Sequence, residues 1–500
     1  MPTWPQYPTI FEINTWVWLS DLSRKHGYPV DLGSVPASEW EAIAKLRFDS
    51  VWLMGVWERS PAGIEISNAN PGLTEDFRRA LSDFRVEDNV GSAYCIRRYR
   101  VDPHLGGPDG LAIARRELAA QGMSLILDFV PNHTALDHPW VSQNPDYYVR
   151  GDARDLQKDP QSFIEIEEKI FARGRDPYFP AWPDVLQLNA FNRGLRHAIK
   201  DTILDIAGQC DGIRCDMAML LLNHIFERTW GARAGGQLET DYWVDVIQAV
   251  KEERPDFLFI AEAYWDREWE LQQQGFDYCY DKRLYDRLEH DNAESIRGHL
   301  CADAAYQSKL VRFIENHDEP RASASFSPAK ERAAAVVMAT TSGARLFHEG
   351  QIEGRKVRIP VFLGRRPYEP EDEELKVFYS KLLKAVAHFP FHEGNWSLCE
   401  TNGWADNQSC LNIVGWTWTS EAGRCVIIVN LSANAAQARV KVPWSDPAKV
   451  VCLNDALTGV SYDRDPSEMQ GTGLYVDLPP WGVHFFECGH HRVGSIRRAA

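Results

Sequence analysis

Several features that place a chain quickly in a class of proteins are missing from this sequence. It contains no uncharged apolar run near the roughly 18 residues that a membrane span requires, no internal repeat and no low-complexity segment. Basic side chains are outnumbered, with 54 against 71 acidic ones, and the net charge of −17 argues against nucleic acid, whose phosphates would be repelled. We therefore expect a soluble, folded protein with a neutral or acid-tolerant ligand.

Cysteine pairs of the CxxC type are also absent. The ten cysteines are irregularly spaced, and several, such as Cys215 and Cys425, lie inside strand-like runs, where a free thiol behaves as a small hydrophobic group. Residues 1–8 have no basic segment followed by an apolar stretch. We expect no structural zinc site and no secretory signal, with reduced cysteines in the cytoplasm.

What the sequence has in abundance is an alternation of strand-like and helix-like segments. A capping box at Ser38–Glu41 opens one helix, another ends at Gly122, and Ser327-Pro328 begins a third. Strand-like runs cover residues 10–19, 49–54, 124–130, 212–216, 258–262, 276–280, 311–316 and 345–348. Eight strands alternating with helices predict a closed parallel (β/α)8 barrel, the TIM barrel.

Two regions depart from this alternation. Residues 134–190 are rich in proline, aromatics and charge without a helical period, and a connection of that length usually has a functional role. After residue 395, short alternating strands separated by turns predict an antiparallel β-sandwich. The predicted domains are a barrel formed by residues 1–133 and 191–395, an inserted subdomain at 134–190 and a C-terminal sandwich at 396–500.

Four of the strand-like runs end in acid or histidine. They are Asp128-Phe-Val-Pro-Asn132-His133, Gly212-Ile-Arg214-Cys-Asp216, Phe259-Ile-Ala-Glu262 and Phe313-Ile-Glu-Asn316-His317-Asp318. Charges at buried strand ends are costly unless they converge on each other and on a ligand. The carboxyl ends of barrel strands meet at one face, so the sequence predicts one polar site there.

In this order the four segments resemble those of the α-amylase family of retaining α-glycosidases and transglycosidases. The family patterns are D-x-V-x-N-H, G-x-R-x-D, an apolar strand ending in Glu, and x-N-H-D; Gly343-Ala-Arg-Leu-Phe-His-Glu-Gly350 is also similar to a family strand. The resemblance covers most of residues 5–490. It implies a TIM barrel whose B subdomain is inserted after strand three, and glycoside hydrolysis through a covalent glycosyl-enzyme intermediate.

The resemblance also implies the roles of three acids. Asp216 is expected to be the nucleophile, Glu262 the acid/base, and Asp318 the third acid that binds ring hydroxyls. Carboxyl groups of a retaining pair lie about 5 to 5.5 Å apart, which neighbouring strand ends can provide. Arg214, two residues before Asp216, shares its strand face, and its charge is expected to keep Asp216 ionised.

Other substrate contacts are expected around these acids. By resemblance, Tyr94 is a platform beneath the cleaved sugar, and His133 and His317 donate hydrogen bonds to its hydroxyls. Trp265 follows Glu262 by three residues and either stacks on a leaving-side sugar or packs its loop. Arg321 closes Asn316-His-Asp-Glu-Pro-Arg321, close to the N-H-D-Q-P-R of oligosaccharide α-glucosidases.

Some positions depart from the family pattern. Cys95 stands where exo-acting α-glucosidases have the aspartate that anchors the chain end. Asp216 is followed by Met-Ala-Met-Leu220 in place of the usual Lys-His, which removes one calcium contact. Asn132 either holds its loop or ligates calcium, as in calcium-dependent members; we expect no metal and no cofactor.

The sequence thus predicts a hydrolase of short α-glucosides or malto-oligosaccharides. An α-glucan transglycosidase and an endo-acting α-amylase are alternatives within the same family. Two non-catalytic alternatives are a partner subunit, which the three acids argue against, and a polysaccharide-binding protein that would use Trp416 and Trp418 of the sandwich. We expect an oligosaccharide ligand, and neither a nucleic-acid nor a membrane partner.

Overall fold

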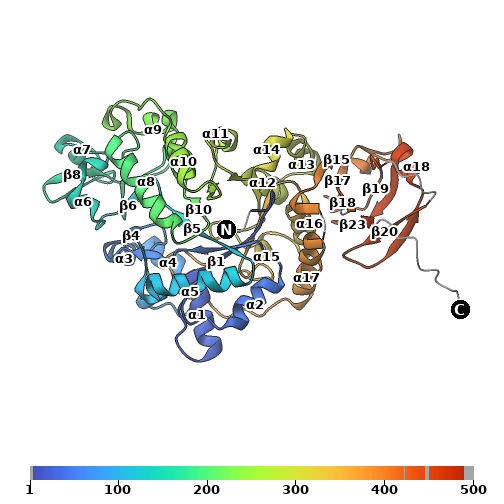
Figure 1. Cartoon of the computed structure of the whole chain (residues 1–500), viewed down its shortest axis with the longest axis horizontal. Coiled ribbons are helices and arrows are strands. Elements are labelled where there is room, and N and C mark those ends of the chain that lie inside the picture. Colours follow the sequence, from blue (N-terminus) through green and yellow to red (C-terminus); the bar gives the residue numbers. More distant parts are fainter. Residues whose placement is uncertain (1–3, 389, 422, 445–449, 489–500) are drawn as a thin grey trace.

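The barrel predicted from the sequence is present in the computed structural model, which describes residues 4–388, 390–421, 423–444 and 450–488 (Figure 1). Eight parallel strands close in the order β1-β14-β13-β12-β11-β10-β5-β2. They are β1 (Thr9–Asn14), β2 (Ser50–Met54), β5 (Ser124–Phe129), β10 (Gly212–Cys215), β11 (Leu258–Ala261), β12 (Tyr278–Tyr280), β13 (Leu310–Arg312) and β14 (Ala344–His348).

Helices cover the outside of the barrel, as in other TIM barrels. The main ones are α1 (Thr15–His26), α2 (Ala37–Lys45), α5 (Gly107–Ala120), α8 (Arg193–Ala207), α10 (Tyr242–Glu253), α12 (Lys282–His290), α13 (Ala293–Leu300), α16 (Pro328–Thr340) and α17 (Glu373–His388). The predicted strand at 10–19 is too long, because Asn14 caps α1 by accepting the backbone N–H of Val17. An apolar run alone does not distinguish a strand from the buried face of the helix that follows it.

Side chains alternate along each strand between the helical layer and the barrel interior. The interior cluster is apolar toward the amino-terminal ends of the strands and contains Ile10, Ile126, Leu258, Ile260 and Val311. Two or four residues further along these strands, polar side chains take over this inward position: Glu12, Asp128 and Glu262 are all buried. Arg214 of β10 is buried as well. The fold therefore concentrates charge at the carboxyl end of the barrel.

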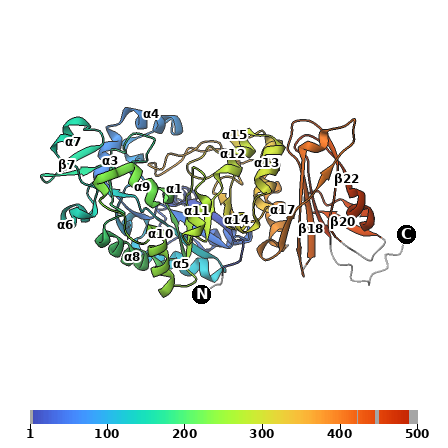
Figure 2. The same cartoon turned by 90° about the horizontal axis from the view of Figure 1, so that it is seen from above.

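The insertion after β5 has small sheets of its own. Strand β6 (His133–Ala135) pairs antiparallel with β9 (Val185–Gln187), and β7 (Phe163–Ile166) forms a hairpin with β8 (Lys169–Ala172). Two short helices, α6 (Trp140–Gln143) and α7 (Ala153–Lys158), complete it. Figures 1 and 2 show the insertion and the C-terminal domain at opposite ends of the long axis.

The C-terminal domain consists of two antiparallel sheets. One has the order β15-β17-β18-β23-β20-β21 and the other β16-β19-β22. The strands are β15 (Asn395–Leu398), β16 (Thr401–Asn402), β17 (Ile413–Ser420), β18 (Gly423–Asn430), β19 (Ala436–Val440), β20 (Val451–Asp455), β21 (Ser461–Arg464), β22 (Leu474–Leu478) and β23 (Val483–Cys488). The last twelve residues of the predicted domain, 489–500, lie outside the described residues.

The idea that Trp416 and Trp418 bind polysaccharide is wrong. Both indoles are fully buried, and both Nε1 atoms donate to the carbonyl of Thr340 at the end of α16, at 3.0 and 2.6 Å. They attach the sandwich to the barrel, because a large aromatic with one satisfied donor suits an interface between two domains. In the described parts of the chain, no helix has the length and apolar character needed to cross a membrane.

Candidate active site

Three acids lie at the carboxyl end of the barrel. Asp216 and Glu262 directly follow β10 and β11, and the backbone ladder continues through them, since Asp216 N–H donates to Phe129 O and Glu262 N–H to Cys215 O. Their side chains are 9% and 3% exposed, whereas Asp318, in the loop after β13, is 43% exposed. Strand geometry thus directs two carboxyl groups inward and leaves the third at the surface of the site.

Arg214 connects the first two acids. Its Nη1 lies 2.8 Å from Asp216 Oδ1 and its Nη2 lies 2.9 Å from Glu262 Oε2. The guanidinium also lies over the rings of Trp52, Tyr94 and Tyr280, at 5.4, 5.3 and 5.5 Å from their centroids. A cation held by aromatic faces and two carboxylates is fixed in place, so it orients both acids.

The expected lowering of the pKa of Asp216 by Arg214 is only part of the balance. Burial raises the pKa of Asp216, and Arg214 opposes this without reversing it. Burial likewise raises the pKa of Glu262 to about 7, again against the charge of Arg214. Both carboxyl groups are therefore harder to ionise than free carboxylates.

Two contacts that the sequence did not predict hold Glu262. The backbone N–H of Met217 donates to Oε2 at 2.6 Å, and the hydroxyl of Tyr264 lies 2.8 Å from Oε1. Met217 reaches this position because it adopts a left-handed conformation, with φ of +42°, directly after Asp216. A sequence signal for Tyr264 existed: it is two residues after Glu262 and so projects from the same side of the chain.

His317 is surrounded by acceptors. Its Nδ1 lies 2.5 Å from Glu12 Oε1, and its Nε2 lies 3.0 Å from Asp318 Oδ2 and 2.6 Å from the Tyr94 hydroxyl. Burial alone would lower the pKa of His317, but Asp318 and Glu12 raise it well above its usual value. In turn, burial would raise the pKa of Asp318, and the His317 charge instead lowers it to about 2.

His133 is neutral, because burial lowers its pKa to about 4. Its Nε2 lies 3.2 Å from the carbonyl of Tyr94 and its Nδ1 lies 3.3 Å from the amide nitrogen of Asn132. The side chain of Asn132 in turn accepts from Gln187 Nε2 at 2.9 Å. Asn132 therefore ties the end of β5 to β9 of the insertion, which is the loop-holding alternative predicted for it.

The remaining predicted contacts lie further out. Arg321 is 2% exposed and its guanidinium bonds Glu315 at 2.6 Å and the Glu349 carbonyl at 2.9 Å. Trp265 is half-buried at the rim, with its ring 4.9 Å from that of Tyr178. Contact of Arg321 with substrate would require it to leave buried partners, and contact of either residue with sugar stays a prediction.

Among the described residues, no cluster of three or more histidines, cysteines or acids has the arrangement of a metal site. Cys95, at the position of the exo-type aspartate, is 1% exposed and its thiol lies 3.2 Å from the carbonyl of Asp184. Burial raises the pKa of this thiol well above its usual range. It is a packed structural residue beneath the site.

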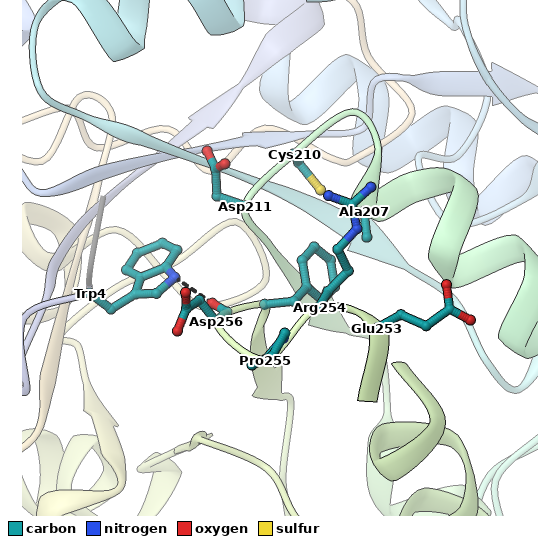
Figure 3. A pocket seen from close by; sticks show the side chains of 9 residues that line it. Trp4, Ala207, Cys210, Asp211, Glu253, Arg254, Pro255 and Asp256 are labelled. Carbon is teal, nitrogen blue, oxygen red and sulfur yellow. Dashed lines mark hydrogen bonds between the residues drawn. The ribbon is translucent and has the colours of Figure 1, made fainter. Parts of the chain in front are cut away.

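A separate pocket of about 190 Å³ lies at the other end of the barrel (Figure 3). Its walls come from residues that precede β10 and β11, including Cys210, Asp211, Asp256 and Phe257, with Trp4 on the opposite side. Trp4 Nε1 donates to the carbonyl of Asp256 at 3.1 Å. This end carries stability rather than catalysis in TIM barrels, and the acids described above lie at the opposite one.

The chain also matches a known protein family. Residues 38–358 match the family model for the catalytic domain of α-amylase, which covers more than half of the chain. The chain belongs to the α-amylase family. The predicted resemblance and the predicted fold class are thereby confirmed.

Individual relatives within the α-amylase family are distant. The chain is 22% identical over 456 residues to the α-amylase MalA of Haloarcula japonica, covering 86% of this chain and 56% of that protein. It is 29% identical over 185 residues to the trehalose synthase/amylase TreS of Mycobacterium tuberculosis, 33% of this chain and 29% of that one. The chain thus spans little more than half the length of MalA.

Solved structures of α-amylases share the fold along nearly the whole chain. The noncanonic maltogenic α-amylase AmyB of Thermotoga neapolitana superposes with a TM-score of 0.69 at 16% identity, covering 97% of this chain and 99% of that one. An α-amylase from Lactobacillus plantarum gives a TM-score of 0.67 at 17% identity, with 96% and 99% coverage. At such identities the likeness concerns the barrel, the insertion and the sandwich, and not the substrate.

Proposed function

We propose that this protein is a retaining α-glycoside hydrolase that acts on short α-glucosides or malto-oligosaccharides. The observation that carries the proposal is the bridge of Arg214 between Asp216 and Glu262, at 2.8 and 2.9 Å. One guanidinium spans only a few ångström. It therefore favours the short carboxyl separation of a retaining pair over the roughly 9 Å of an inverting pair with a water between its members.

Burial and neighbouring charges give the two acids different roles. With a pKa of about 7, Glu262 holds a proton near neutral pH. Its Oε2 faces two donors, Arg214 and the Met217 N–H, whereas Oε1 faces only the Tyr264 hydroxyl, so Oε1 is the better position for the proton. Asp216 attacks the anomeric carbon while Glu262 gives this proton to the departing oxygen. Glu262 then removes a proton from the water that releases the sugar from Asp216.

A contact between Trp265 and the insertion, at the outer edge of the site, supports the preference for short substrates. The loop after β11 carries Glu262 and then turns through two left-handed residues, Trp265 and Asp266, with φ of +61° and +59°. Arg283 holds the carboxylate of Asp266 through two nitrogens. The Trp265 ring meets Tyr178 of the insertion at 4.9 Å. Glu262, the proposed acid, lies on the side of the site where the leaving group departs. The contact between Trp265 and Tyr178 therefore limits the site on that side, where a long glucan would continue.

Sugar transfer is the second candidate, because TreS, the relative with the higher identity, is named a trehalose synthase as well as an amylase. Transfer replaces water by a sugar hydroxyl in the second step and needs no change in the three acids. A substrate site that is closed on the leaving-group side would retain the released sugar, and this would favour transfer over hydrolysis.

The test is incubation with maltose, maltoheptaose, isomaltose, trehalose and sucrose, with the products resolved by chromatography and the anomer released at first turnover identified by NMR. Glucose or short maltodextrins of retained configuration support the proposal. New disaccharides or longer products would indicate transfer, and an inverted anomer would contradict the retaining pair.

Chain-length preference has its own test, which compares initial rates on maltotriose and soluble starch at equal reducing-end concentration. Tyr178→Ala should raise the rate on starch relative to maltotriose by opening the rim. Phe179→Ala is the matched control, because this neighbour is 67% exposed. Rapid mid-chain cleavage of starch by the wild type would instead make the protein an endo-amylase.

A cytoplasmic location and the absence of nucleic-acid and membrane partners are part of the same proposal. All ten cysteines lie in the described ranges and are free thiols. Reduced cysteines are usual in the cytoplasm. Fractionation of producing cells, with the protein detected in each fraction, tests the location.

A further inference from the structure

Glu12 is a buried acid that none of the family motifs contains. It lies on β1 with no exposed surface and points into the barrel on the same face as Ile10. One carboxyl oxygen, Oε1, lies 2.5 Å from Nδ1 of His317, and the other, Oε2, has no hydrogen-bond partner. A buried carboxylate is costly unless it is paired, so the contact with His317 is what makes this position tolerable.

The two nitrogens of His317 face two different carboxyl groups. Nδ1 faces Glu12, and Nε2 faces both Asp318, in an ion pair at 3.0 Å, and the Tyr94 hydroxyl, at 2.6 Å. A neutral imidazole carries one N–H and no charge, so its other nitrogen would be an acceptor beside a carboxylate or the Tyr94 hydroxyl. An imidazolium presents an N–H and a positive charge to both carboxyl groups. The ring is also held by packing, since it stacks on Tyr94 with centroids 5.4 Å apart and meets Trp52 edge-on at 5.5 Å.

We propose that Glu12 is a positioning residue that keeps His317 doubly protonated and aimed at Asp318, and thereby holds the third acid ionised and oriented toward the sugar. The inference rests on the proposed function, because Asp318 acts on a substrate only if one is bound. Glu12 itself touches no substrate in this scheme. It acts through His317 alone.

The other groups around the pair explain why a second carboxylate is needed. The charged and titratable side chains that face Glu12 and His317 come from the neighbouring strands and loops: Tyr94, Asp128, Arg214, Tyr280 and Asp318. The positive charge of Arg214 is already committed to Asp216 and Glu262. Without Glu12, His317 would have one carboxylate partner and a buried environment that favours its neutral form.

A double-mutant cycle separates a positioning role from a merely structural one. Glu12→Gln keeps the size and one acceptor but removes the charge, and should lower kcat/KM on an aryl α-glucoside by about tenfold, mainly through kcat. In a His317→Gln background the same change should cost less than about twofold. Equal losses in both backgrounds would overturn the proposal.

Glu331→Gln is the matched control for loss of a buried carboxylate. Glu331 is 3% exposed on α16 and both of its oxygens accept from Ser323 at 2.9 Å, away from the three acids. It should change thermal stability without changing kcat/KM. Glu12→Asp, which keeps the charge and withdraws it by one methylene, should recover part of the activity lost in Glu12→Gln.

A readout that needs no substrate distinguishes failure of this inference from failure of the proposed function. In protein labelled with nitrogen-15 histidine, the signals of His317, assigned by their loss in His317→Gln, should report both ring nitrogens as protonated at neutral pH and above. In Glu12→Gln one nitrogen should lose its proton at lower pH than in the wild type.

An unchanged titration would contradict the role of Glu12 even if the protein hydrolyses α-glucosides. The expected titration with no hydrolysis of any α-glucoside would leave the Glu12–His317 pairing standing and refute the proposed function, and with it the sugar-facing role of Asp318.

Discussion

At the amino-terminal end of the barrel, Asp49, Asp211 and Asp277 each precede a strand and accept a backbone N–H from the strand beside it, at 2.7, 2.8 and 2.8 Å. At the carboxyl end, Asp216 and Glu262 follow their strands and share the single guanidinium of Arg214. Both ends therefore carry a ring of acids. They differ in whether each acid has a cation to itself.

The partners of Asp211 and Asp277, at the amino-terminal end, make this difference clear. Asp211 also bonds Arg115 at 2.7 Å, and Asp277 bonds Lys251 at 2.7 Å, so each has its own backbone donor and its own cation. At the carboxyl end, Asp216 and Glu262 are more deeply buried and share one cation, Arg214. The pKa values of the acids there separate, to about 7 for Glu262 and about 2 for Asp318. Acids that each have a cation of their own stabilise the fold, whereas buried acids that share one cation are poised for proton transfer.

The largest effect expected from breaking this contrast is that of Asp216→Asn. The change preserves volume and removes the nucleophile, so kcat should fall on the order of 10⁴-fold or more. Initial rates on the best substrate, with circular dichroism as the check on folding, measure it. A variant that keeps a tenth of the wild-type rate would show that the nucleophile is another residue.

Glu262→Gln should have a large effect that depends on the leaving group. Loss of a general acid costs about 10²- to 10⁴-fold, and activated aryl glycosides, whose leaving groups need little protonation, should lose far less than maltose. The measurement is kcat/KM for both substrate types. Equal losses on the two would count against the acid/base role.

The pH profile should show the same separation of acids. Glu262 must be protonated to act as the acid, so kcat/KM should fall as the pH rises through about 7, by about tenfold per unit at the limit. Ionised Asp216 is required as well, and since burial raises its pKa, the acid limb should lie above the usual range of a carboxylate. A profile that stays flat from pH 6 to pH 9, conditions that span the value for Glu262, would contradict this assignment.

The smallest effect is expected at the amino-terminal end of the barrel. Asp211→Asn weakens the bond to Arg115 and retains one acceptor for the backbone of β5, so unfolding free energy should fall by about 1–2 kcal/mol. Activity should not change. Urea denaturation and the rate on maltose measure the two quantities, and a loss of activity without a loss of stability would mean that the two ends are coupled.

Much of the site could be predicted from the sequence because each acid ends an apolar run, and chain geometry alone sends such residues to one end of the barrel. Other parts could not be predicted. Arg321 belongs to a recognisable motif, yet its guanidinium is occupied by Glu315 and the backbone of Glu349. A motif specifies a residue type and its place on a strand, and does not specify which neighbours use its donors.

By itself the sequence determined the eight-stranded barrel, the antiparallel C-terminal domain and the three acids, because these depend on local periodicity and on residues adjacent to strand ends. The tertiary structure alone decided the partners. Glu12 meets His317 across 305 residues of chain, and Trp416 reaches Thr340 across 76. Such pairs leave no periodic trace in the sequence. They exist because a closed barrel brings distant strands together in a buried space, where each charge or indole must find a partner.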